Sequence, residues 1–196
     1  LIIDDASKDK TFDTAIHWAN TNKNIKIKIL KNPKNLGYGG NQKVGFNYAI
    51  KNNFTNLVLL HGDGQYAPEI ITDLVEFHIK NYNKLTLGSR MIKKSNALKG
   101  RMPIYKFVGH IILTFLQNLI LSSNLSEFHT GYRVYNVEKL KKINFHLNTN
   151  DYHFDTQTII QLLMNNFKIG EYSIPTYYGD EISYVNGFKY AYNVIC

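Results

Sequence analysis

The chain has 196 residues, a suitable length for one domain with a hydrophobic core. Its hydrophobic content of 44% and charged content of 19% exclude a disordered chain. The net charge of +8 favours polyanionic partners, but no basic run has the length of a nucleic-acid tail, so we expect no nucleic-acid partner. The single cysteine, Cys196, excludes a disulfide framework and favours a reducing compartment.

The two ends of the chain predict a truncated sequence. The chain starts at Leu1 without a methionine or a signal peptide, and it opens inside an apolar stretch. It stops at Cys196, in a tyrosine-rich segment that has little other pattern. We expect a missing N-terminal strand, and we expect that any membrane segment would follow Cys196.

Periodicity predicts an α/β chain, because apolar strands alternate with amphipathic helices. Strands are expected at residues 1–3, 25–29, 57–60, 85–90 and 168–178. Helices are expected at residues 11–20, 68–82, 104–121 and 151–164, and over Val44, Tyr48 and Ala49. In an open α/β sheet, ligands bind at the carboxyl ends of the strands.

The stretch at residues 57–69 combines a strand with a polar turn. Four apolar residues predict a strand buried on both faces, and His61, Asp63 and Gln65 follow at alternate positions. A carboxylate, an imidazole and an amide oxygen could together hold a divalent cation. The alternative is a strand followed by an ordinary polar turn.

Two further strand ends carry polar residues. Asp4 and Asp5 follow the first strand and point toward the same crevice, although Asp5 or Ser7 could instead cap the next helix. The glycine-rich residues 35–43 open a helix and could offer N–H groups to an anion, or could simply need positive φ. A dinucleotide fingerprint is excluded because Gln42 occupies its third glycine position.

Positive charge gathers after the strand at residues 85–90, which delivers Arg90 to the ligand edge. A polar loop follows, flexible by composition, with Lys93, Lys94, Lys99 and Arg101. The positive charge of this loop is typical of a phosphate clamp or a membrane-facing lid, and the alternative is a solvated basic loop.

Residues 104–121 are the most apolar stretch. One helical stripe is apolar: Ile104, Val108, Ile111, Ile112, Phe115 and Leu119. The opposite stripe is polar: Lys106, His110, Thr114, Gln117 and Asn118. The polar stripe and the short length argue against a transmembrane span. Core packing of the apolar stripe is the favoured prediction, and contact with lipid is the alternative.

Residues 126–135 place a carboxylate, an imidazole and a guanidinium in one short segment. Glu127 or His129 could act as a general base, and Arg133 could hold a phosphate or pair with a carboxylate. Each of these residues could also be structural. The absence of H-E-x-x-H and G-x-S-x-G motifs excludes zinc proteases and serine hydrolases of the usual kinds.

Six motifs occur in a specific order across nearly the whole chain. They are Asp4 to Thr11 (D-D-x-S-x-D-x-T), Asn35 with Gly37 and Gly39, Asp63 with Gln65, Pro68 and Glu69, Gly88-Ser89-Arg90, Glu127 to Arg133, and Glu171 with Ile174-Pro175. In this order they resemble the family 2 glycosyltransferases with the GT-A fold, especially the dolichol- or polyprenol-phosphate mannosyl- and glucosyltransferases. The resemblance implies a mixed, mostly parallel sheet flanked by helices, in a single catalytic domain over residues 1–196.

Two features depart from that family pattern. His61 stands where the family has the first aspartate of D-x-D, and imidazole suits Mn²⁺ better than Mg²⁺. The first strand of the family, which helps to bind the nucleotide, is missing.

The resemblance implies an inverting, metal-dependent transfer of a sugar from a UDP- or GDP-sugar to an acceptor, with a polyprenyl or dolichyl phosphate favoured. It implies that a cytoplasmic enzyme, free or at the cytoplasmic face of a membrane, uses Mg²⁺ or Mn²⁺. The implied nucleotide-binding residues are Asp4, Asp5, Ser7, Gly37 and Asp63, and the implied metal ligands are Asp63, Gln65 and His61. The implied catalytic residues are Asp63, Glu127, Arg90, Arg101 and Arg133.

Within that scheme the arginines neutralise phosphates and Glu127 faces the acceptor, taking a proton if the acceptor is a hydroxyl. Two rival interpretations remain from the sequence. One is a sugar-phosphate nucleotidyltransferase, and the other is a sugar-nucleotide-binding module without transfer activity.

Overall fold

The computed structural model describes residues 1–179, 190 and 193–194, so most of the tyrosine-rich end lies outside the described residues. The strands are β1 (Ile2–Asp4), β2 (Ile29–Lys31), β3 (Asn56–Leu59), β4 (Leu85–Ser89), β5 (Arg133–Asn136) and β6 (Ile169–Ser173). The helices are α1 (Thr11–Thr21), α2 (Gly37–Lys51), α3 (Ile71–Lys80), α4 (Lys94–Lys99), α5 (Ile104–Leu121), α6 (Val137–Leu140) and α7 (Phe154–Met164). Short 3₁₀ turns lie at Pro68–Ile70 (η1) and Phe145–Leu147 (η2).

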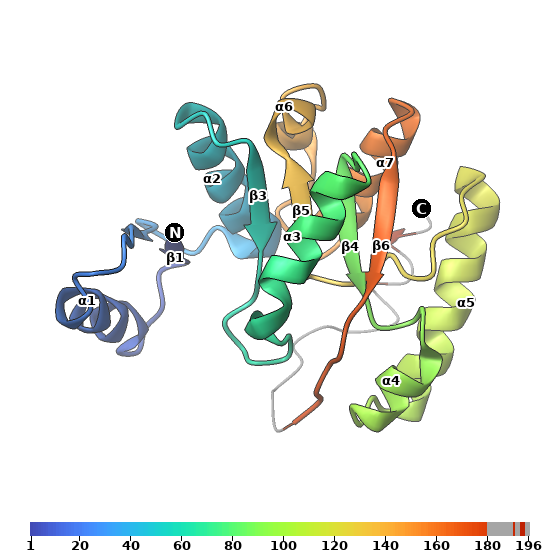
Figure 1. Ribbon diagram of the computed structural model, residues 1–196, viewed down its shortest axis with the longest axis horizontal. Helices are drawn as coiled ribbons and strands as arrows, with labels where there is room; N and C mark the ends of the chain where they lie inside the picture. The colour runs from blue at the N-terminus through green and yellow to red at the C-terminus, as the bar shows by residue number, and fades with distance from the viewer. Residues whose placement is uncertain (180–189, 191–192, 195–196) are drawn as a thin grey trace.

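A four-stranded sheet in the order β3-β5-β4-β6 forms the centre of the molecule. Strand β5 runs antiparallel to both β3 and β4, whereas β6 is parallel to β4. Strands β3, β4 and β6 therefore point the same way, and their carboxyl ends share one edge of the sheet (Figure 1). A separate parallel pair, β1-β2, carries the N-terminal residues. The predicted mixed, mostly parallel α/β architecture is confirmed.

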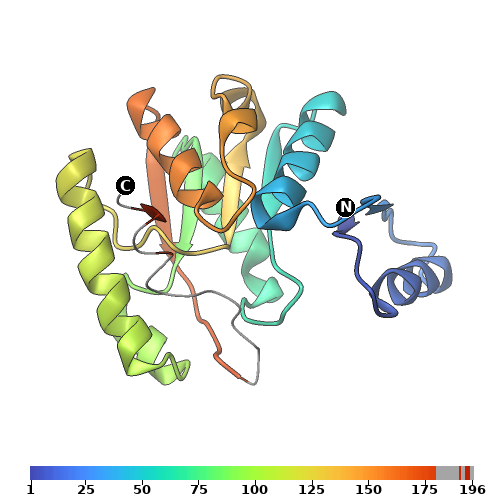
Figure 2. The same ribbon diagram turned by 180° about the vertical axis from the view of Figure 1, so that it is seen from behind.

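Helices cover both faces of this sheet. Helix α3 lies on one face, and α2, α6 and α7 lie on the other, as the two opposite views show (Figures 1 and 2). The alternation of side chains along the strands divides the core accordingly, since successive residues point to opposite faces. Leu85 and Leu87 of β4 join the cluster under α2 and α7, which includes Phe46. Val134 of β5 joins the cluster under α3, which includes Leu74.

Several element boundaries differ from the sequence prediction. The strand expected at residues 25–29 begins only at Ile29, and Ile25 is exposed. Strand β3 is only partly buried, because it is the edge strand of the described sheet and pairs with β5 alone. The loop expected to be flexible contains α4, which is fixed by the buried side chain of Ala97 against Met91.

Helix α5 is turned the opposite way from the favoured prediction. Most of the stripe expected in the core is exposed, with Phe115 and Leu119 at 65% and 69% of their full accessibility, and only Ile111 of that stripe packs on a core cluster. The polar residues Thr114 and Gln117 are the ones that are buried. By length and composition alone α5 is the one helix among the described residues that could cross a membrane, and 11% of it is buried. The prediction of ordinary core packing is therefore wrong.

Candidate active site

The first turn of α2 joins the tip of β1 to the turn that follows β3. The Asp5 carboxylate accepts hydrogen bonds from the N–H of Leu36 at 2.9 Å and from the N–H of Gly37 at 3.0 Å. It also accepts one from the side-chain amide of Asn32 at 2.7 Å. Asp5 therefore caps α2 at its N-terminus, as an acidic group there should.

The next residue along α2, Tyr38, reaches the turn after β3. Its hydroxyl lies 3.1 Å from Nε2 of His61 and 2.7 Å from a carboxylate oxygen of Asp155. Burial, followed by the negative charge of Asp155, raises the pKa of Tyr38 well above its usual value. The predicted nucleotide tip and the predicted metal turn thus flank one helical turn, although they lie more than 50 residues apart in the sequence.

The glycine-rich loop serves packing and has little to offer an anion. The N–H groups of Leu36 and Gly37 are used by Asp5, and the N–H of Gly39 donates to the carbonyl of Asn150 at 2.8 Å. The prediction that these groups are available to an anion is therefore wrong. Gly37 has a φ of +78°, and a Cβ on Gly39 would lie 2.7 Å from the Cβ of Phe154. The glycines permit a left-handed turn and close approach of the segment before α7.

Of the two acidic residues at the β1 tip, Asp4 is the one whose carboxylate has an oxygen left for a ligand. It is buried, and its Oδ2 accepts a hydrogen bond from the N–H of Ser7 at 3.2 Å. Its Oδ1 is buried and has no hydrogen-bond partner. A buried carboxylate oxygen without a partner is costly, so a ligand that donates a hydrogen bond there would remove that cost.

His61 is half-buried among aromatic side chains. Its ring lies edge-on to the rings of Tyr38 and Tyr66, at centroid distances of 5.5 and 5.7 Å. The hydroxyl of Tyr66 accepts a hydrogen bond from the N–H of Gly131 at 2.9 Å. A Cβ built on Gly131 would lie 2.6 Å from Nε2 of His61. Burial lowers the pKa of His61 below its usual value.

We expect Gly131→Ala to lower the free energy of unfolding by about 1–3 kcal/mol, because the new methyl group overlaps the His61 ring. Urea denaturation measures the change. Gly109→Ala is the matched control, since nothing lies within 4 Å of a Cβ at Gly109 of α5. Alanine suits a helix interior better than glycine, so the control should not destabilise. Equal effects of both substitutions would contradict the close packing of His61 on Gly131.

Asp63 lies exposed at the tip of the turn after β3. Its Oδ1 accepts a hydrogen bond from the N–H of Gln65 at 3.0 Å. The carbonyl of Gln65 accepts hydrogen bonds from the N–H of Tyr177 and the hydroxyl of Thr176, both at 3.2 Å, and these bonds tie the turn to the segment after β6.

The described residues contain no group of three His, Cys, Asp or Glu side chains close enough to hold a metal ion by themselves. A carboxylate and a nearby imidazole do fit a divalent cation that completes its coordination with phosphate oxygens and water. Asp63 and His61 supply a carboxylate and an imidazole within one turn, so a cation there would need further ligands from outside the described residues.

Arg133 is fully buried below the site. It forms an ion pair with Asp155 at 3.3 Å, and its Nε–H donates to the carbonyl of Thr130 at 2.7 Å. Another of its nitrogens donates to the carbonyl of Phe128 at 3.0 Å. Of the two roles that the sequence allowed, the structure shows pairing with a carboxylate. The guanidinium has no access to a phosphate and instead fixes the loop at residues 128–130.

Glu127 and Arg90 form a second buried ion pair. Glu127 also accepts a hydrogen bond from the N–H of Arg90 at 2.9 Å, and Arg90 donates to the hydroxyl of Tyr178 at 2.7 Å. Burial alone would raise the pKa of Glu127, but the positive charge of Arg90 and the His110 imidazole, 3.5 Å away, hold it well below its usual range. A carboxylate with so low a pKa is a weak general base.

His129, the other candidate base, is similarly unsuited to that role. Burial and the neighbouring charge of His110 lower its pKa to about 3. Its Nδ1 lies 2.9 Å from the hydroxyl of Tyr190. At neutral pH a group with this pKa takes a proton only weakly.

Arg101 is the predicted arginine that reaches the surface. Its guanidinium is exposed and lies 5.8 Å from the centre of the Tyr177 ring. The residue has a φ of +64° and lies three residues before the start of α5. The structure thus leaves Asp63 and Arg101 accessible and buries Arg90, Glu127 and Arg133.

Comparison with known proteins identifies the family. Residues 1–144 match the family model described as glycosyl transferase family 2. The chain belongs to this family. It is a glycosyltransferase, and its mixed sheet flanked by helices is consistent with the GT-A fold of the family.

Named relatives cover most of the chain. A UDP-N-acetylglucosamine–dolichyl-phosphate N-acetylglucosaminyltransferase of Methanococcus voltae is 28% identical over all of this chain and 83% of its own length. An uncharacterised protein of Methanocaldococcus jannaschii is 26% identical over all of this chain and 79% of its own length. An undecaprenyl-phosphate mannosyltransferase of Micrococcus luteus is 27% identical over 74% of this chain and 57% of its own length.

The contact between Tyr38 and Asp155 beside this candidate site is the feature that sequence reasoning did not identify, although the sequence does place Asp155 as an acid at the edge of the fold. The two residues lie 117 residues apart, so no local spacing connects them. The nearest signal was the position of Tyr38 among the glycines of residues 35–43, which include the first turn of α2, against the start of α7. Only the fold brings the hydroxyl and the carboxylate together.

Proposed function

We propose that this glycosyltransferase moves a sugar from a UDP- or GDP-sugar to a polyprenyl or dolichyl phosphate at the cytoplasmic face of a membrane, with inversion at the anomeric carbon. The names of the Methanococcus voltae and Micrococcus luteus relatives support the acceptor class. The observation that carries the proposal is the outward apolar face of α5, which starts at the end of the sheet where Asp63 and Arg90 follow their strands (Figure 1).

On the donor side, Asp4 supports nucleotide binding through its partnerless Oδ1, and Asp5, Ser7 and Gly37 build the tip that carries it. Asp63, together with His61 and Gln65, would hold Mg²⁺ or Mn²⁺ against the diphosphate. When bound, that cation neutralises the charge that builds up on the leaving diphosphate.

On the acceptor side, Arg101 and the lysines at both ends of α4 would attract the lipid phosphate. Lys93, Lys94 and Lys99 are exposed beside the start of α5. A lipid phosphate is already anionic, so its attack on the sugar needs positive charge nearby and no strong base. The low pKa values of Glu127 and His129 agree with this kind of acceptor better than with a hydroxyl acceptor.

A transfer assay tests the proposal. The chain is incubated with UDP-sugars or GDP-sugars and an undecaprenyl phosphate in detergent, with Mn²⁺ or with a chelator, and lipid-linked sugar is measured. We expect transfer to the phosphate but not to undecaprenol without a phosphate. Equal transfer to the free alcohol, or nucleotide-sugar binding without transfer to any acceptor, would contradict the proposal.

The apolar face of α5 should hold the protein on lipid. We expect Phe115→Glu to reduce binding to anionic phospholipid vesicles by about tenfold or more, because it replaces apolar area that lipid would bury. Phe115 is 65% exposed, so the thermal unfolding midpoint should change little. Vesicle co-sedimentation measures the binding.

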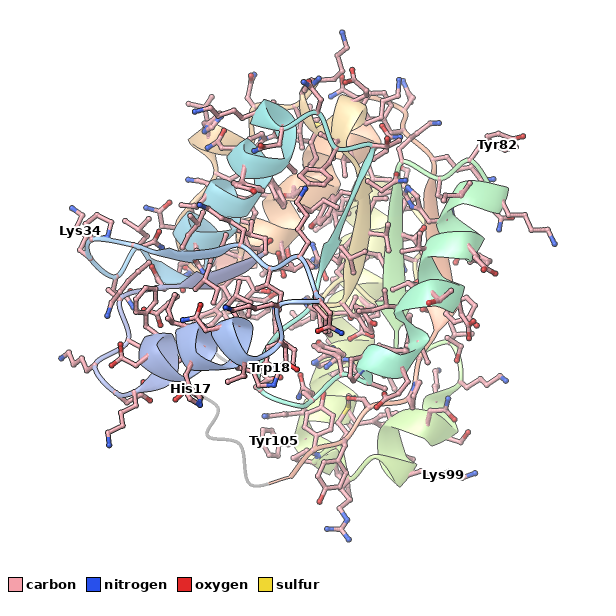
Figure 3. All side chains as sticks on the ribbon, turned by 60° about the vertical axis from the view of Figure 1, so that its left-hand side comes forward. His17, Trp18, Lys34, Tyr82, Lys99 and Tyr105 are labelled. Carbon is pink, nitrogen blue, oxygen red and sulfur yellow. The ribbon has the colours of Figure 1, made fainter. Side chains whose placement is uncertain are left out.

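Tyr82→Glu is the control for this experiment. Tyr82 is 79% exposed and lies at the end of the molecule opposite Lys99 and Tyr105 (Figure 3). The Tyr82→Glu substitution introduces the same charge at an exposed aromatic position in the loop between α3 and β4 and leaves α5 unchanged. Equal losses of vesicle binding in the two variants would indicate a general charge effect and would contradict docking through α5.

A further inference from the structure

The hydroxyl of Tyr38 is the centre of a buried polar network under the His61 turn. Asp155 accepts a hydrogen bond from this hydroxyl at 2.7 Å and another from the side-chain amide of Gln42 at 2.9 Å. The same carboxylate forms the ion pair with Arg133 at 3.3 Å. Since an ion-paired aspartate is a carboxylate, it can only accept hydrogen bonds.

The protons available in this network determine which nitrogen of the His61 ring is protonated. A tyrosine hydroxyl has one proton, and the proton of Tyr38 is directed to Asp155. The oxygen of Tyr38 must therefore accept the hydrogen bond at 3.1 Å from Nε2 of His61. In a neutral imidazole one nitrogen carries the proton and the other carries a lone pair. The lone pair of His61 is consequently on Nδ1.

The ring also has little freedom to turn. Gly131 lies directly against it, and the rings of Tyr38 and Tyr66 meet it edge-on from two sides. Nδ1 itself has no hydrogen-bond partner in the part of the chain that the structure describes, whereas Nε2 is occupied. A histidine that donates one N–H to a fixed acceptor and keeps the other nitrogen open is the usual arrangement of a metal-binding imidazole.

We propose that Tyr38 and Asp155 are positioning residues that hold His61 as its Nε2–H tautomer, which reserves the Nδ1 lone pair for the divalent cation at the Asp63 turn. The inference rests on the metal part of the proposed function. It explains how a histidine can serve at a position where the sequence pattern of the family has an aspartate. An ionised aspartate carries no proton and can bind a cation through either oxygen. A neutral imidazole carries one proton, and Tyr38 keeps that proton on Nε2.

Nitrogen-15 NMR of the histidine rings tests the tautomer in the chain without metal or donor. The chain has seven histidines, and the His61 signals are assigned as those lost in His61→Gln. At pH 7.5 we expect the shifts of a protonated Nε2 and an unprotonated Nδ1. A proton on Nδ1, or an equal mixture of the two tautomers, would overturn the proposal. This measurement needs no variant at Tyr38.

The Tyr38→Phe variant then tests the source of the tautomer, because it removes one oxygen and keeps the ring. We expect its His61 signals to move toward a mixture of tautomers. Tyr152→Phe is the matched control, since the Tyr152 ring lies 5.3 Å from that of Tyr38 and its hydroxyl has no hydrogen bond to any described residue. An unchanged tautomer in Tyr38→Phe would show that the hydroxyl does not set it.

A titration with Mn²⁺ in the presence of UDP, and separately of GDP, connects the tautomer to metal binding. We expect Tyr38→Phe to weaken Mn²⁺ binding by about 10–100-fold and Tyr152→Phe to leave it unchanged. Equal Mn²⁺ affinity in both variants would overturn the positioning role. If the wild-type chain binds no Mn²⁺ with either nucleotide, the metal part of the proposed function fails, and the tautomer result identifies which of the two ideas has failed.

Discussion

Replacing Asp63 with asparagine should reduce kcat/KM for sugar transfer by about a thousandfold or more. A bound cation can supply several kcal/mol of stabilisation to the departing diphosphate, and each 1.36 kcal/mol is a factor of ten in rate. Asparagine keeps an oxygen that can accept the hydrogen bond from the N–H of Gln65, so the turn should retain its shape while the charge is lost. A transfer assay at saturating Mn²⁺ measures the loss.

The control for this substitution is Asp73→Asn. Asp73 is exposed in the first turn of α3 and should tolerate the same change with full activity. Mn²⁺ binding in the presence of UDP or GDP should fall in Asp63→Asn alone. Unchanged turnover in Asp63→Asn would defeat the assignment of this carboxylate to a metal.

The second large effect concerns stability. We expect Glu127→Gln to lower the free energy of unfolding by about 3–5 kcal/mol, because it leaves the buried guanidinium of Arg90 without its counter-charge. Nε of Arg90 already lacks a hydrogen-bond partner, so the guanidinium depends on Glu127 for its counter-charge. Urea denaturation of the purified variant measures the change.

A matched ion pair at the surface provides the control. Glu138 pairs with Lys141 at 2.5 Å, but the Glu138 side chain is 66% exposed. Water can replace this pair, so Glu138→Gln should leave the denaturation midpoint almost unchanged. If the two substitutions had similar effects, burial would not be the reason for the strength of the Arg90–Glu127 pair.

The same ion pair predicts a pH dependence. The pKa of Glu127 is held below its usual value by Arg90 and by His110, although burial opposes this. The stability that depends on the ionised carboxylate is therefore fully present above the pKa of the unfolded chain, about 4.3, and is lost as the pH falls below it. Denaturation midpoints between pH 6 and pH 3 should fall more steeply for the wild type than for Glu127→Gln, and parallel curves would contradict this.

The sequence predicted the ligand edge of the fold well, for a physical reason. Apolar runs followed by glycine or acidic residues identify strands and their carboxyl ends, so Asp63 and Arg90 were expected at one edge and β3 and β4 do run the same way. The bounds of α5 at Ile104–Leu121 were also predicted, because its apolar and polar residues recur at helical spacing over this stretch.

The features that could not be predicted are contacts between residues far apart in the sequence and the orientation of a helix against its neighbours. The pair of Arg133 and Asp155 joins residues 22 positions apart, and nothing in the spacing of either motif implies it. For α5 the periodicity defines two faces but does not say which one meets the protein. Phe107 and Ile111 at its inner edge meet a small cluster around Met91, and this local fit sets the rotation of the whole helix.

The rotation of α5 has a consequence for handling the protein in solution. A helix that turns its aliphatic and aromatic side chains to water will seek another such surface when no amphiphile is present. A sizing column run in plain buffer would then report self-association through α5, and mild detergent or nanodiscs should dissolve it. The monomer released in this way is the species whose activity toward long-chain phosphates should be compared between variants.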